Sequence, residues 1–126
     1  MAKVVSLRRF SLATRKGQVM VLVFVSKEQR PGETRVAATP ETIKQLVKAG
    51  VEVAVQADAG RAASYPDSDY EAAGAKIVSD AATAWPSADM VLAIPPPSAE
   101  QVGKLKPGCT LVCSLQPMLA LPLVRA

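Results

Sequence analysis

The sequence contains no histidine and only two cysteines, Cys109 and Cys113. Without histidine there is no His-based general base, no Ser-His-Asp triad and none of the common zinc or non-haem iron sites. Two cysteines can neither supply four thiolates to a metal nor form a secreted disulfide scaffold. This composition is typical of a chain that works in a reducing cytoplasm.

Long hydrophobic runs are missing as well. The longest, VMVLVFV at 19–25, has seven residues, whereas roughly 20 apolar residues are needed to cross a bilayer. The sequence therefore predicts no transmembrane helix. Its length of 126 residues, with 49% of them hydrophobic, is that of one globular domain.

Acidic residues are absent from residues 1–19, which hold five of the 15 lysines and arginines. We predict a disordered basic leader here; an organelle transit peptide, or a start codon placed too early with Met20 as the first residue, are alternatives. Residues 20–126 hold the other 10 bases and all 11 acids, a net charge of −1. This second segment is assigned as the domain, and its charge predicts no nucleic-acid partner.

Apolar runs and helix signals alternate along the domain. Thr39, Pro40 and Gly50, for example, have the spacing of a helix cap, a first helical residue and a helix end. The pattern predicts an α/β fold: a Rossmann-like (flavodoxin-like), doubly wound, mainly parallel sheet of about five strands with crossover helices. Strands are expected at 19–25, 51–56, 75–78, 89–94 and 109–115, and helices at 40–49, 67–73, 80–85 and 98–105, with a further helix beginning in 117–126.

Ligands of such sheets bind beyond the carboxyl ends of the strands, so the loops after Val25, Gln56, Ile94 and Leu115 are the places to look for function. The first loop carries the motif SKEQRPGETRVAATPE at 26–41. Its arginine Arg35, near the start of a helix, and Lys27 are candidates for an anion site. A mixed-charge loop more commonly forms a solvated ion-pair surface, and this alternative stays open.

The run KEQRPGETRVAATP at 27–40 resembles the opening of the N-terminal domain of the alanine dehydrogenase and NAD(P) transhydrogenase alpha-subunit family. The resemblance continues in the same order through VKAGVEVAVQADAG, DSDYEAAGAKIV, ADMVLAI and LKPGCTLVCSLQP. It covers nearly everything from Met20 onwards. The domain would then be incomplete at its C-terminus.

The resemblance implies roles for single residues. Arg35 stands where alanine dehydrogenases have the arginine that binds the substrate carboxylate, and with Lys27 and Gln116 it forms the candidate anion site. Pro95 stands where these enzymes have a lysine, and Gln116 stands where they have the catalytic histidine. Both departures argue against amino-acid deamination and favour the transhydrogenase branch.

In this family the NAD pocket lies mainly in a second Rossmann domain, and this sequence contains no G-x-G-x-x-G. The expected function is therefore the N-terminal part of an alpha subunit that transfers hydride between NAD(H) and NADP(H), coupled to proton translocation, inactive alone and without its own cofactor. Implied partners are a separately encoded NAD-binding domain and membrane transhydrogenase subunits at the inner membrane, besides a homo-oligomer. Alternatives are a non-catalytic ligand- or partner-binding domain and a truncated gene remnant.

Overall fold

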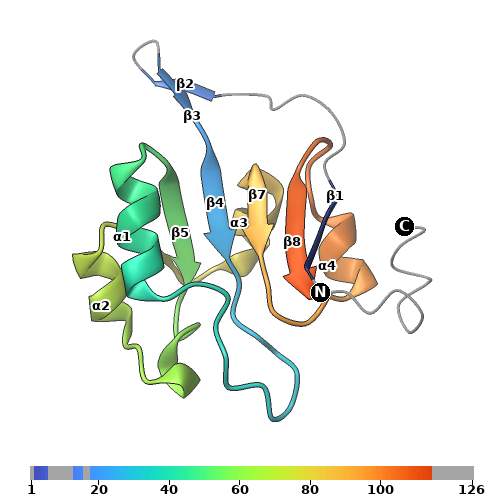
Figure 1. Cartoon of the computed structure of the whole chain (residues 1–126). Helices are drawn as coiled ribbons and strands as arrows, with labels where there is room; N and C mark the ends of the chain where they lie inside the picture. Colours follow the sequence, from blue (N-terminus) through green and yellow to red (C-terminus); the bar gives the residue numbers. More distant parts are fainter. Residues whose placement is uncertain (1, 6–12, 16–17, 115–126) are drawn as a thin grey trace.

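The computed structural model describes residues 2–5, 13–15 and 18–114, whose core is a parallel sheet (Figure 1). Five parallel strands have the order β6-β5-β4-β7-β8, and β1 adds an antiparallel strand beside β8. Counted along the chain, the parallel strands are ordered 3-2-1-4-5, the Rossmann order among doubly wound sheets. The predicted α/β fold with a five-stranded parallel sheet is confirmed, and its strand order is the Rossmann order rather than the flavodoxin-like one. The strands are β1 (Ala2–Val5), β4 (Leu22–Val25), β5 (Glu52–Gln56), β6 (Lys76–Val78), β7 (Met90–Leu92) and β8 (Thr110–Ser114).

Helices cover both faces of this sheet because the central strands alternate their side chains between two apolar clusters. Val23 and Val25 of β4 belong to the cluster beneath α1 (Pro40–Lys48) and α2 (Asp67–Ala72). Phe24 points to the opposite face, where it packs edge-on against Trp85 of α3 (Ala81–Ser87), with ring centroids 5.6 Å apart. The remaining helices are a short 3-10 turn η1 (Arg61–Ala63) and α4 (Ala99–Gly103).

Local capping chemistry sets the helix starts. The Thr39 hydroxyl accepts a hydrogen bond from the backbone N–H of Thr42, and Pro40 occupies the first turn of α1. Gly50, just beyond the end of α1, has a φ of +88°, which favours glycine. The helix predicted at 40–49 is thus confirmed with its predicted cap.

The N-terminal segment contains three short strands. β1 and β2 (Ala13–Arg15) lie within the predicted leader at 1–19, and β3 (Gln18–Met20) ends one residue beyond it; β2 and β3 pair as an antiparallel hairpin. The prediction of a disordered leader stays a prediction. Strand pairing joins backbone N–H and C=O groups, which do not depend on the side chains, so the pairing of β1 with β8 does not require an amphipathic pattern in the sequence. The helix predicted to begin in 117–126 lies outside the described residues.

Tyr70 of α2 connects the helical layer to the loop that precedes α1. Its side chain is fully buried, and its hydroxyl donates a hydrogen bond of 2.9 Å to the carbonyl oxygen of Ala38. Burial raises the pKa of Tyr70 to about 12. The ring lies so close to Gly60 that a Cβ there would be 2.6 Å from it. Tyr70 thus anchors the C-terminal end of the long loop between β4 and α1.

Substitution Tyr70→Phe tests this anchor. Without the hydroxyl, the carbonyl of buried Ala38 loses its partner, so we expect the free energy of unfolding to fall by about 1–3 kcal/mol. Urea denaturation followed by circular dichroism measures it. The control is Tyr65→Phe, because Tyr65 is half-buried and packs edge-on against Tyr70, and we expect a change within about 0.5 kcal/mol. Equal losses in both variants would show that the Ala38 hydrogen bond contributes nothing specific.

Candidate functional site

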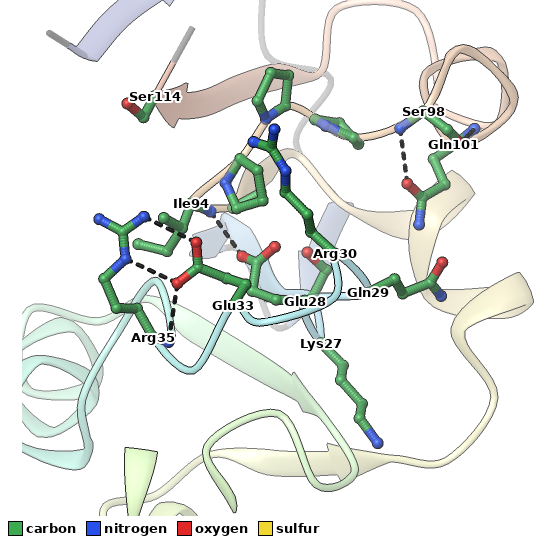
Figure 2. Close-up of a pocket in the computed structure, with 15 residues that line it drawn as sticks. Lys27, Glu28, Gln29, Arg30, Glu33, Arg35, Ile94, Ser98, Gln101 and Ser114 are labelled. Carbon is green, nitrogen blue, oxygen red and sulfur yellow. Dashed lines mark hydrogen bonds and ion pairs between the residues drawn. The ribbon is translucent and has the colours of Figure 1, made fainter. Parts of the chain in front are cut away.

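A pocket of about 510 Å³ lies where β4 and β7 end side by side (Figure 2). This is the point at which the strand order reverses direction, since β5 follows β4 on one side and β7 lies on the other. Doubly wound sheets bind their ligands at this position. The lining comes from the loop after β4, the loop after β7, α4 and the end of β8: Ser26 to Arg30, Glu33, Arg35, Ala93 to Ser98, Gln101 and Ser114.

A tight turn shapes the first of these loops. The backbone N–H of Glu33 donates to the carbonyl oxygen of Arg30 at 3.0 Å, with Pro31 and Gly32 between them. Gly32 has a φ of +80°, and a proline followed by such a glycine is the signature of a type II turn. The RPGE sequence therefore holds Arg30 and Glu33 at neighbouring points of the pocket wall.

Glu33 is paired with Arg35. Its two carboxylate oxygens accept hydrogen bonds of 2.8 Å from Nε and Nη2 of the guanidinium, and one of them also accepts from the Arg35 backbone N–H at 3.0 Å. The Glu33 side chain is 11% exposed and the Arg35 side chain 69%. These hydrogen bonds lower the pKa of Glu33 to about 2 and raise the pKa of Arg35. The pair is therefore fully ionised at neutral pH.

Glu28 joins the two loops across the pocket. Its Oε1 accepts a hydrogen bond of 2.6 Å from the backbone N–H of Ile94, at the exit of β7. Partial burial raises the pKa of Glu28, against the lowering effect of this hydrogen bond. Beyond Ile94 the wall consists of Pro95, Pro96 and Pro97, which have no backbone N–H to donate.

The sequence-predicted site residues have three different outcomes. Arg35 lines the pocket, but its guanidinium is engaged by Glu33. Lys27 also lines the pocket, and its backbone N–H donates to the Gln56 side chain at 2.9 Å; Figure 2 shows its ammonium group directed away from the Glu33–Arg35 pair. Gln116 lies outside the described residues. The predicted grouping of these residues as an anion site stays a prediction.

The 26–41 motif contains Glu28, Arg30 and Glu33, but they were not among the predicted binding residues. The signal for Glu33 is its spacing: residues two apart in an extended segment project to the same side, so Glu33 and Arg35 can meet. Glu28 and Ile94 are 66 residues apart in the sequence, so no local sequence pattern predicts their contact. Pro95 lines the pocket wall, at the position where the resemblance placed a lysine.

The described ranges hold neither a membrane-spanning helix nor a metal-binding cluster. Over residues 2–5, 13–15 and 18–114, no helix combines the length and apolarity required to cross a membrane. In the same part of the chain, histidine, cysteine, aspartate and glutamate side chains form no cluster of three that could hold a metal ion.

Residues 24–126 match the family model "Alanine dehydrogenase/PNT, N-terminal domain". The chain belongs to this family. An alanine dehydrogenase of Halomonas elongata is 44% identical over 89 residues, which are 71% of this chain and 24% of that protein. The first part of the NAD(P) transhydrogenase subunit alpha of Rhodospirillum rubrum is 41% identical over 109 residues, which are 82% of this chain and 28% of that protein.

Solved structures agree with this assignment. A transhydrogenase from Sinorhizobium meliloti superposes with a TM-score of 0.71 at 35% identity, over 76% of this chain and 27% of that one. An L-alanine dehydrogenase superposes with a TM-score of 0.63 at 34% identity, over 68% and 23%. The two branches are about equally close, and this chain spans about a quarter of the length of these relatives.

The two pocket carboxylates predict opposite pH effects on stability. The pKa of Glu33 is lowered from 4.5 to about 2, so its pairing stabilises the fold above about pH 4.5 and is lost as the pH falls towards 2. The pKa of Glu28 is raised, so its contribution is fully present below pH 4.5 and is lost as the pH rises through the folded-state pKa. We therefore expect the Glu33→Gln variant to have a lower free energy of unfolding than the parent at neutral pH. For the Glu28→Gln variant, we expect the free energy of unfolding to increase relative to that of the parent as the pH rises.

Urea denaturation of the parent and both variants between about pH 2 and 7 measures these differences. Each glutamine variant serves as the control for the other, since both remove one negative charge from the same pocket. Differences from the parent that do not change with pH would contradict the assigned environments of Glu28 and Glu33.

Proposed function

We propose that the chain is the N-terminal part of an NAD(P) transhydrogenase alpha subunit, which transfers hydride between NAD(H) and NADP(H). The single observation that carries the choice of branch is Pro95. It lines the pocket directly after β7, where the family resemblance gives alanine dehydrogenases a lysine. A proline side chain carries no charge and cannot transfer a proton, so the position after β7 offers no cation to an amino-acid substrate.

The complete absence of histidine supports the same choice. Oxidative deamination requires a base to accept the proton of the reacting centre, and histidine is the residue most often used. Gln116, which stands in its place in the resemblance, has a neutral amide and cannot take that role. Hydride transfer between two nicotinamide cofactors needs no such base, because the cofactors carry the chemistry.

In this proposal, the 126 residues supply the frame for a second, NAD-binding domain. The loops at the carboxyl ends of β4 and β7 are held in place by Glu28, by the Arg30–Glu33 turn and by Tyr70. Loops that are fixed in this way can orient the NAD-binding domain that packs against them. The name of the relative from Rhodospirillum rubrum describes one part of an alpha subunit. We propose membrane transhydrogenase subunits as further partners.

A reconstitution assay tests this function. The full chain is mixed with a separately produced NAD-binding domain of a transhydrogenase alpha subunit and with the NADP(H)-binding subunit. We expect hydride transfer from NADPH to an NAD analogue in the complete mixture and none when the chain is omitted. In the same mixture, L-alanine and NAD should give no pyruvate. Pyruvate formation would move the chain to the alanine dehydrogenase branch, and a complete mixture without hydride transfer would contradict the proposal.

A second candidate function is a small-ligand-binding domain without catalysis. The observation that favours it is the composition of the pocket lining, which includes three cationic residues, Lys27, Arg30 and Arg35, and two acidic ones, Glu28 and Glu33. Such an excess attracts anionic ligands whether or not hydride transfer follows.

A further inference from the structure

The two outer strands of the parallel sheet, β6 and β8, differ in how well their own sequences protect them. β6 is three residues long, and its Lys76 forms an ion pair with Glu52 of β5. Short strands and lysines are two of the means by which a sheet edge avoids pairing with another chain. β8 is five residues long, and its sequence TLVCS contains no charged side chain. Without β1, the sheet would end at this uncharged strand.

β1 covers the outer edge of β8. Its four residues pair antiparallel with residues 111–114, and Figure 1 shows it beside β8, at the end of the sheet opposite to β6. Among the strands that the structure describes, β1 pairs with β8 alone, and the β2–β3 hairpin that follows it forms a separate sheet. The family match begins at residue 24, beyond all three of these strands. β1 therefore lies outside the matched domain and occupies the edge of that domain that carries no charge.

We propose that the outer edge of β8 is a surface through which two copies of this chain dimerise, and that β1 prevents this pairing by occupying the edge. The ladder with β1 shows that the edge accepts an antiparallel strand. The β8 strand of a second copy, related by a two-fold axis, would run antiparallel in the same place and satisfy the same backbone groups. Because TLVCS is uncharged, no like charges would face each other across this pair. The proposal requires neither a second domain nor hydride transfer, so it is independent of the proposed function.

Two adjacent proline substitutions remove β1 from the edge in the full chain. Successive residues of an antiparallel ladder direct their N–H groups alternately towards the partner strand and away from it. Lys3→Pro and Val4→Pro together therefore remove one N–H that faces β8. The matched control is Val19→Pro, which makes the same kind of change in β3, where Val19 pairs with Thr14 of the separate hairpin. Urea denaturation followed by circular dichroism checks that both variants are folded.

Sedimentation equilibrium measures the self-association of the parent and the variants. We expect the double-proline variant to dimerise with a dissociation constant at least about tenfold lower than that of the parent, and Val19→Pro to stay within about twofold of the parent. Hydrogen exchange locates the surface, because the amides of residues 110–114 should exchange more slowly in the concentrated dimer than in the dilute monomer. Unchanged association of the double variant would overturn the proposal, and so would a dimer in which these amides gain no protection.

A cross-link tests the covered edge without breaking any strand. Lys3 and Cys113 are Cα partners in the β1–β8 ladder, and such partners lie about 4.5–5.5 Å apart, within the range that a disulfide can join. Mild oxidation of the Lys3→Cys variant should therefore link the introduced cysteine to Cys113 within one chain, as measured by mass spectrometry and non-reducing electrophoresis. This linked chain should not dimerise. The control Lys3→Cys/Cys113→Ser keeps Cys109 and should stay unlinked. A covalent dimer joined through Cys113 would place β1 on a second copy and overturn the proposal.

Discussion

Two carboxylates close the strand pair on which the rest of the sheet depends. The ladder between β4 and β7 is short, joining Val23–Val25 to Met90–Leu92. At its amino end, Asp89 accepts a hydrogen bond of 2.8 Å from the backbone N–H of Leu22, and at its carboxyl end Glu28 accepts one of 2.6 Å from Ile94. Because β5 and β6 lie to one side of this pair and β8 to the other, the two halves of the sheet meet here.

At both ends of the β4–β7 pair a carboxylate accepts a backbone hydrogen bond, but the surroundings of the two carboxylates differ. Asp89 is 5% exposed, and its second oxygen forms an ion pair of 2.6 Å with the Lys106 ammonium, so the buried charge is fully satisfied. Glu28 is only partly buried and lies in the wall of the pocket, and burial raises its pKa. The amino end of the strand pair is therefore a closed structural contact, whereas the carboxyl end opens onto the pocket.

Features encoded by neighbouring residues were predictable from the sequence, and features that depend on distant backbone were not. The cap at Thr39 and the glycine at Gly50 bound α1 through local hydrogen bonds and a local φ, so its range was predicted to within one residue. The pairing of β1 with β8 depends on where an open sheet edge lies in space, which no pattern in residues 1–19 records. The Glu28–Ile94 contact likewise requires the strand order to be known first.

Arg35 shows why a family motif does not by itself assign a role to a residue. The motif places Arg35 in the pocket wall. Its electrostatic state depends on Glu33, whose pKa of about 2 keeps the pair ionised at any pH at which the fold is expected to work. A guanidinium whose fork is already filled by a carboxylate has less to offer a second anion than one without such a partner. The motif therefore sets the position of Arg35, and the neighbouring carboxylate determines which hydrogen bonds it can still make.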